Sequence, residues 1–129
     1  MLVSVLYHLT LGIAGLLYDQ TFPIGSAAAV RSGSDHIFGI FETNGWHSSA
    51  ALVLGVVSLY FTVRPRGARA AALQIGVLHV VLFVALAVWP PETFWMASNA
   101  ADQVVHAFTA IASIGAALLT RASKEMAER

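Results

Sequence analysis

The sequence contains no cysteine and few charged side chains, and each shortage excludes a class of protein. Without cysteine the chain forms no disulfide, iron–sulfur cluster or thiolate site. Charged residues make up 11% of the 129 residues, whereas a soluble domain carries about 25%. Lipid is therefore expected to surround much of the surface. The seven basic and seven acidic side chains cancel, which removes the basic surface that a nucleic-acid-binding protein needs.

Four long stretches contain no Asp, Glu, Lys or Arg, and 57% of the whole sequence is hydrophobic. These stretches cover residues 2–18, 45–63, 70–89 and 103–120. As an α-helix rising about 1.5 Å per residue, each is long enough to cross most or all of a hydrocarbon core near 30 Å. A helix also satisfies its own backbone hydrogen bonds in lipid. The sequence therefore predicts an all-α integral membrane protein, a single four-transmembrane-helix bundle in which the first stretch is a retained helix.

Basic residues and tryptophans indicate the orientation of the predicted helices. Six of the seven basic side chains fall in the second loop or the C-terminal tail: Arg64, Arg66, Arg69, Arg121, Lys124 and Arg129. Only Arg31 lies in the first loop. Cytoplasmic loops are enriched in Lys and Arg, so both termini are expected in the cytoplasm (N-in/C-in). Trp46, Trp89 and Trp95 fall at the opposite, outer interface, as an aromatic belt predicts.

The connections and helix ends carry further signals. The long first outer loop, residues 19–43, contains the apolar run Ile37–Phe41, which is too short to span. We expect this run to lie in the membrane interface or to fold back onto the bundle. Pro90-Pro91 is expected to end the third helix, and Ser98 or Asn99 to cap the fourth. Close helix packing is expected at the glycines within the helices, Gly12, Gly15, Gly55 and Gly115.

Polar side chains gather at the outer ends of the second and fourth helices. The outer polar cluster consists of Glu42, Asn44, His47, Asn99, Asp102 and His106. Asp102 and His106 are four residues apart and so share one helix face. Deeper in the bundle, His8 and His79 each lie about 15 Å from a helix end, near the midplane. We expect these two to hydrogen-bond to each other or to a polar neighbour, since unpartnered polar groups are costly there.

Several roles are open for these residues. The simplest is that they cap helix ends and tie the long loop to the bundle. His47, Asp102 and His106 also offer ligand types for a metal, although their spacing is not a diagnostic zinc signature. Haem is a third choice, held between two histidines at matched depth: His47 with His106, or His8 with His79. A fourth alternative is a site that binds the head group of a lipid or quinone.

Two segments resemble a known family. Residues 37–47, Ile-Phe-Gly-Ile-Phe-Glu-Thr-Asn-Gly-Trp-His, lead into the second helix, and residues 99–106, Asn-Ala-Ala-Asp-Gln-Val-Val-His, begin the fourth. The pattern is similar to a bacterial four-helix membrane family, common in actinobacteria and known as domain of unknown function 4383. The resemblance covers most of the chain and implies the fold and the outer polar cluster, but no activity. That family tends to carry a second histidine one turn after the first, where this chain has Ala51.

The sequence offers no serine–histidine–acid grouping, phosphate loop or paired buried carboxylates. The first hypothesis is therefore a small, non-catalytic protein of the bacterial inner membrane, an accessory or stabilising subunit of a larger complex such as a respiratory one. The second is binding of a metal, haem or quinone by the outer polar cluster. The third is an enzyme acting on lipid or quinone, with His106 as general base oriented by Asp102. Expected partners are membrane lipids and either other membrane subunits or further copies of this chain, and no motif specifies a cofactor.

Overall fold

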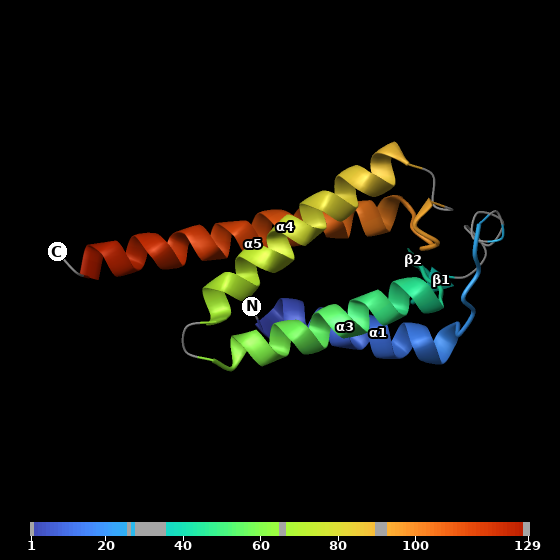
Figure 1. Cartoon of the computed structure of the whole chain (residues 1–129), viewed down its shortest axis with the longest axis horizontal. Helices are drawn as coiled ribbons and strands as arrows, with labels where there is room; N and C mark the ends of the chain where they lie inside the picture. Colours follow the sequence, from blue (N-terminus) through green and yellow to red (C-terminus); the bar gives the residue numbers. More distant parts are fainter. Residues whose placement is uncertain (1, 26, 28–35, 65–66, 90–92, 128–129) are drawn as a thin grey trace.

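The chain folds into four α-helices and one short β-hairpin in a computed structural model (Figure 1). The structure describes residues 2–25, 27, 36–64, 67–89 and 93–127, the last seven as backbone only. The helices are α1 (Leu2–Tyr18), α3 (Gly45–Thr62), α4 (Gly67–Val88) and α5 (Ala100–Ala127), and the strands are β1 (His36–Ile37) and β2 (Phe41–Glu42). By length and composition, α4 and the Ala100–Thr120 part of α5 can each cross a membrane, and α1 is a shorter apolar helix.

Some residues used in the predictions lie outside the described part of the chain. These are Arg31, Arg66, Arg129 and Pro90-Pro91, together with the side chains of Arg121 and Lys124. The predicted bounds hold for α1, and α3 ends one residue earlier than predicted. Both α4 and α5 begin three residues earlier than predicted, and α5 continues seven residues beyond its apolar run. Ala, Arg, Lys, Glu and Met all favour helix, so the helix does not end where hydrophobicity ends.

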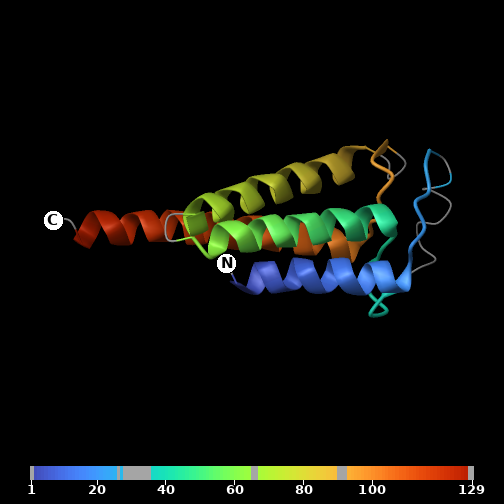
Figure 2. The ribbon, with the colours of Figure 1, turned by 60° about the horizontal axis from the view of Figure 1, so that its bottom comes forward.

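Glycines bring α1 and α3 into close contact, and these two helices form one half of the bundle (Figures 1 and 2). A Cβ atom on Gly12 would lie 2.5 Å from the backbone nitrogen of Leu52, and one on Gly55 would lie 2.9 Å from that of Leu9. Neither position has room for a larger side chain unless the helices separate. The predicted packing role of these glycines is confirmed, and Gly15 meets α3 in the same way.

The other half of the bundle is the pair α4 and α5. Here Gly76 provides the close approach, because a Cβ atom on it would lie 2.5 Å from Cγ1 of Ile114. Gly115 faces open space, so its predicted packing role is wrong. The two halves meet across a smaller contact between α3 and α4. Space between helices is therefore found between the halves rather than within them.

The apolar run in the first loop forms the β-hairpin, a feature the sequence did not predict. His36 pairs with Glu42 and Ile37 with Phe41. The turn between the strands has positive φ at Phe38 (56°) and Gly39 (70°), which is a conformation that glycine adopts readily. Ile37 is buried and Phe41 packs beside it against α1 and α3, whereas Phe38 points outward. The expectation that the run folds back onto the bundle is confirmed for one side of the hairpin.

The hairpin, the start of α3 and the start of α5 lie at one end of the bundle, called here the loop end, and both termini lie toward the other (Figure 1). At the loop end Trp46 and Trp95 pack together with ring centroids 5.6 Å apart. The indole of Trp46 donates to the carbonyl oxygen of Pro23 at 3.0 Å, which holds the first loop against α3. The candidate site begins directly beneath these contacts.

Candidate functional site

Asparagines cap both helices that begin at the loop end. The side-chain oxygen of Asn44 accepts a hydrogen bond from the backbone N–H of His47 at 2.9 Å. At the other helix, Asn99 Oδ1 accepts from the N–H of Asp102 at 3.1 Å, and Asp102 returns the bond by accepting from the N–H of Asn99 at 2.9 Å. This reciprocal pair is the capping-box arrangement, with aspartate as the acidic partner. It explains why α5 begins at Ala100 rather than at the first long apolar run.

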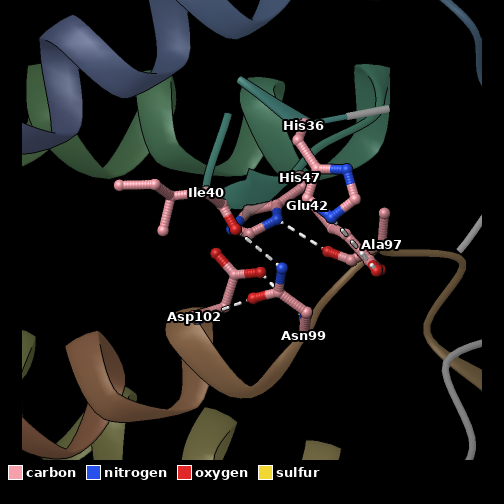
Figure 3. A network of polar contacts seen from close by, with 7 residues as sticks. All are labelled: His36, Ile40, Glu42, His47, Ala97, Asn99 and Asp102. Atoms are coloured by element: carbon pink, nitrogen blue, oxygen red, sulfur yellow. Dashed lines mark hydrogen bonds and ion pairs between the residues drawn. The ribbon is translucent and has the colours of Figure 1, made fainter. Parts of the chain in front are cut away.

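The amide groups of the same two asparagines tie the loops across the bundle. Asn44 Nδ2 donates to the carbonyl oxygen of Trp95, just before α5, at 2.8 Å. Asn99 Nδ2 donates to the carbonyl oxygen of Ile40, just before α3, also at 2.8 Å (Figure 3). Each asparagine thus caps its own helix and holds the loop that leads into the other. The interpretation of these residues as caps and loop ties is confirmed.

His47 adds a third tie and at the same time turns one ring nitrogen inward. Its Nδ1 lies 2.8 Å from the carbonyl oxygen of Ala97 (Figure 3). A carbonyl oxygen only accepts, so Nδ1 carries the hydrogen and the neutral ring leaves Nε2 as an acceptor. Glu42 lies beside this group in β2, where its carboxyl oxygen is 3.9 Å from Nε2 of His36. Glu42 is also buried and interacts with Asp102, so the hairpin contributes a second carboxyl group beside His47.

A cavity of about 170 Å³ lies between the two halves of the bundle, below the loop end. Each of the four helices contributes one histidine to its wall: His8, His47, His79 and His106. Asp102 and Tyr7 complete the polar part of the wall. The rest of the wall is apolar, formed mostly by Leu11, Leu54, Leu78, Leu82, Leu86 and Met96. Apolar walls with a few convergent polar groups are typical of small-molecule sites.

The histidines form a row across this cavity. His8 and His79 are joined through their Nε2 atoms, which lie 3.0 Å apart. The rings of His79 and His106 have centroids 5.3 Å apart, and those of His106 and His47 are 6.3 Å apart. Of the partners expected for His8 and His79, the structure shows each other and, for His8, also Ser4. The row runs from that pair to the start of α3.

His106 has an unsatisfied nitrogen, and the buried acid in the cavity wall is close to the row. Nδ1 of His106 is buried without a hydrogen-bond partner among the described residues. Most buried polar atoms are paired, so an orphan of this kind is typical of a site that receives a further molecule. Asp102, one turn earlier on α5, is buried and interacts electrostatically with His47. Polar atoms of His47, Asp102 and His106 therefore line the same part of the cavity, where they can form hydrogen bonds with a bound molecule.

The structure brings the three predicted metal ligands, His47, Asp102 and His106, to one cavity. Within the described residues, however, no three His, Asp or Glu side chains are arranged so that they could hold a metal ion. The metal site stays a prediction that this geometry does not support. Of the other predicted residues, Asn44 and Asn99 hold the loops at the loop end and do not line the cavity, while His8 and His79 lie at the far end of the row.

Sequence reasoning missed that the outer and midplane histidines share one cavity. It sorted them by depth into two separate pairs, and it did not include Tyr7, Met96 or the Ala97 carbonyl oxygen. One signal was available, because each of the four apolar stretches contains a single histidine. One histidine in each apolar stretch indicates a shared interior site better than four separate caps do.

Comparison with protein families gives a match over most of the chain. A family model described as Domain of unknown function (DUF4383) matches residues 1–119, from α1 to the last apolar turns of α5. Comparison with curated proteins and with solved structures found no match. The match therefore covers every residue of the cavity and the loop ties and brings no activity with it.

Proposed function

The chain belongs to this family of unknown function, and we propose that it is a membrane protein that binds the ring of a quinone or quinol in its histidine-lined cavity. The observation that carries the proposal is the cavity itself. It combines leucine walls with imidazoles from four helices, and Nδ1 of one of these imidazoles, His106, is buried without a hydrogen-bond partner among the described residues. Binding is the whole of the proposed activity, and no reaction is assigned.

The size of the cavity favours a single ring over a larger cofactor. A cavity of 150 Å³ in another protein accommodates benzene, and this one measures about 170 Å³. One six-membered ring with small substituents fits such a space. A haem, with four pyrrole rings in one plane, does not fit without separating the helices. The cavity is also partly open, which leaves room for the apolar tail that quinones carry.

The polar groups suit a ring with hydroxyl or carbonyl oxygens on opposite sides. Nε2 of His47 accepts a hydrogen bond from a hydroxyl, because Nδ1 of that ring already donates to Ala97. His106 lies 6.3 Å from His47, centroid to centroid, and its Nδ1 has no hydrogen-bond partner in the described part of the chain. Pockets of this kind orient a ligand through a few directional hydrogen bonds inside an otherwise apolar space.

The proposal includes four membrane spans in the bacterial inner membrane, with both termini in the cytoplasm. Support comes from the outward faces of all four helices, which expose Val3, Val53, Val88 and Ile111 among other large apolar side chains. Exposed apolar surface of this extent requires lipid or protein cover. Trp46 and Trp95 mark the loop end, and Arg64 and Arg69 lie toward the other end, as an outer belt and an inner basic loop require.

The direct test is titration of the purified protein in detergent with duroquinol, a single-ring quinol, followed by quenching of tryptophan fluorescence. His47→Ala and His106→Ala are each expected to weaken binding about tenfold, since a lost hydrogen bond to a ligand is worth roughly 1–1.5 kcal/mol. His36→Ala is the matched control, because His36 is the histidine of the hairpin and does not line the cavity. Equal binding by all three variants and the parent protein would contradict the proposal.

A second pair of variants tests the cavity rather than its hydrogen bonds. Ala51 lies in the cavity wall, and Ala87 lies on the outside of α4. Ala51→Leu fills part of the cavity and is expected to abolish duroquinol binding, whereas Ala87→Leu adds the same volume toward lipid and leaves binding unchanged. A purified protein that carried haem or stoichiometric metal instead of binding quinol would replace the quinone proposal with the corresponding cofactor.

A further inference from the structure

His8 and His79 meet tip to tip in the centre of the bundle, with their Nε2 atoms 3.0 Å apart. Their other ring nitrogens are both occupied. Nδ1 of His8 lies 2.6 Å from the carbonyl oxygen of Ser4, and Nδ1 of His79 lies 2.8 Å from that of Ile75. A carbonyl oxygen only accepts hydrogen bonds, so each Nδ1 carries a hydrogen.

With both hydrogens at Nδ1, neither Nε2 atom carries a hydrogen that could form a hydrogen bond between the two rings. A neutral imidazole has a single N–H, and both rings use theirs at Nδ1. Two neutral rings would therefore turn bare lone pairs toward each other at 3.0 Å, which is repulsive. One additional proton converts the contact into an N–H···N hydrogen bond of ordinary length. We propose that His8 and His79 hold one shared proton between their Nε2 atoms, so that the pair carries a single positive charge.

The surroundings of Ser4 favour the charged pair over a neutral one. The 2.6 Å bond from His8 to the Ser4 carbonyl oxygen is as short as charge-assisted hydrogen bonds are. A neutral pair requires one bare Nδ1, and the nearest hydroxyl that could donate to it, Ser4 Oγ, is 3.4 Å from Nδ1 of His8. That distance is too long for a good hydrogen bond. With a bare Nδ1 on His8, the neutral form would therefore place that nitrogen 2.6 Å from a carbonyl oxygen, with a hydroxyl donor only at 3.4 Å.

The titratable groups that face the pair come from three helices: Tyr7 from α1, His47 from α3, and Asp102 and His106 from α5. Asp102 is the carboxylate among the cavity-lining residues. Buried charges in membrane helices pair with an opposite charge or face a polar cavity, and here the cavity wall provides both.

The other two histidines give this proton a route to the loop end. His106 follows His79 at 5.3 Å and His47 follows His106 at 6.3 Å, measured between ring centroids. No direct hydrogen bond joins these rings among the described residues, but the cavity beside them is large enough for several waters. Water between imidazoles completes a hydrogen-bonded path. The pair is thus a proton-holding site that exchanges with the loop end through His106 and His47.

The test is solid-state NMR of protein labelled with ¹⁵N-histidine, in lipid vesicles at pH 7 and without any quinone. We expect protonated Nδ1 on both rings and a ¹⁵N–¹⁵N scalar coupling across the shared hydrogen bond between His8 and His79. A neutral tautomer on both rings would overturn the inference. Because the measurement is made with the cavity free of ligand, its outcome is independent of whether the protein binds duroquinol.

Variants distinguish a shared proton from a bound metal or a neutral contact between the two rings. His79→Gln is expected to remove the coupling and to leave His8 as a neutral ring, whereas His36→Gln leaves the signals unchanged. Ser4→Ala removes the hydroxyl but keeps the carbonyl oxygen, so the coupling is expected to persist. A metal bound in stoichiometric amount, together with loss of both Nε2 signals from the protonated range, would also overturn the inference. If His79→Gln does not fold, the spectrum of the unmodified protein still distinguishes a shared proton from two neutral rings.

Discussion

Asn44 and Asn99 occupy equivalent places in the two halves of the bundle, and each donates its amide to the loop that precedes the other's helix. Both also accept a backbone N–H of their own helix, from His47 and Asp102. The two halves are therefore joined at the loop end by a crossed pair of hydrogen bonds. This crossed pair fixes the positions of His47 and Asp102, and with them one end of the cavity.

Removal of either asparagine is expected to destabilise the fold. Asn44→Ala loses the helix cap, worth about 1 kcal/mol, and also the amide bond to Trp95, worth a similar amount. Asn44→Asp keeps the cap acceptor but turns a buried carboxylate oxygen toward the carbonyl oxygen of Trp95, so it is expected to lose at least as much stability as Asn44→Ala. The measurement is the midpoint of thermal unfolding in detergent for the two variants and the parent protein. Equal stability of Asn44→Ala and the parent would show that the crossed pair contributes nothing.

The glycine contacts lead to a prediction with a built-in control. Gly12→Ala places a methyl group against the backbone of Leu52 and is expected to cost about 1–3 kcal/mol, as overpacking does. Gly115→Ala adds the same group where nothing lies within 4 Å. It is expected to be neutral or to stabilise the helix by up to about 1 kcal/mol. Thermal unfolding of both variants checks the contrast, and a loss at Gly115 as large as that at Gly12 would contradict it.

The absence of cysteine makes the proposed topology simple to test, because a single introduced thiol has no background. Gln20→Cys lies at the loop end, and Val63→Cys lies at the other end just after α3. In intact bacterial cells a membrane-impermeant maleimide is expected to label Gln20→Cys only. After permeabilisation it labels both. Labelling of Val63→Cys alone in intact cells would mean that the orientation is opposite to the one proposed. Labelling of both variants would place positions 20 and 63 on the same side and contradict the proposal that α3 crosses the membrane.

An accessory role in a larger membrane complex stays a prediction, since the exposed apolar faces suit lipid tails and partner helices equally. Isolation of the tagged protein in mild detergent at native abundance, followed by mass spectrometry, tests it. Larger subunits recovered in stoichiometric amount would establish the accessory role. Recovery of the free protein or of a homo-oligomer would contradict it and leave ligand binding as the sole proposal.

Much of the fold was predictable, because long stretches without charged residues indicate long apolar helices directly. Residues 2–18 were predicted as α1 with the bounds that the structure has. The error at α5 arose because hydropathy reports contact with lipid, whereas the helix begins at its Asn99 cap and runs on through a charged tail. The β-hairpin was missed because its two-residue strands are too short to give an alternating pattern.

The candidate site was predictable in its residues but not in its arrangement. Helices that are apolar on nearly every face give no periodic signal for the direction in which His8 or His79 points. Their contact joins positions 71 residues apart, and only the packing of four helices decides it. The depth of a residue along its helix can be counted from the sequence, so His8 and His79 were predicted to lie at the same level. The direction in which each side chain points around its helix cannot be counted, so the shared cavity was not predicted.

The hydrogen bonds that Asn44 and His47 make at the loop end also constrain the order in which the protein assembles during synthesis. His47 is synthesised 50 residues before Ala97, whose carbonyl oxygen occupies its Nδ1. At a synthesis rate of about 5–20 residues per second, the first helical hairpin therefore waits roughly 3–10 s for its partner. During that interval the amide of Asn44 and the imidazole of His47 lack the partners that they have in the folded protein. Assembly of the loop end is thus a late step that occurs only after the fourth helix begins to emerge.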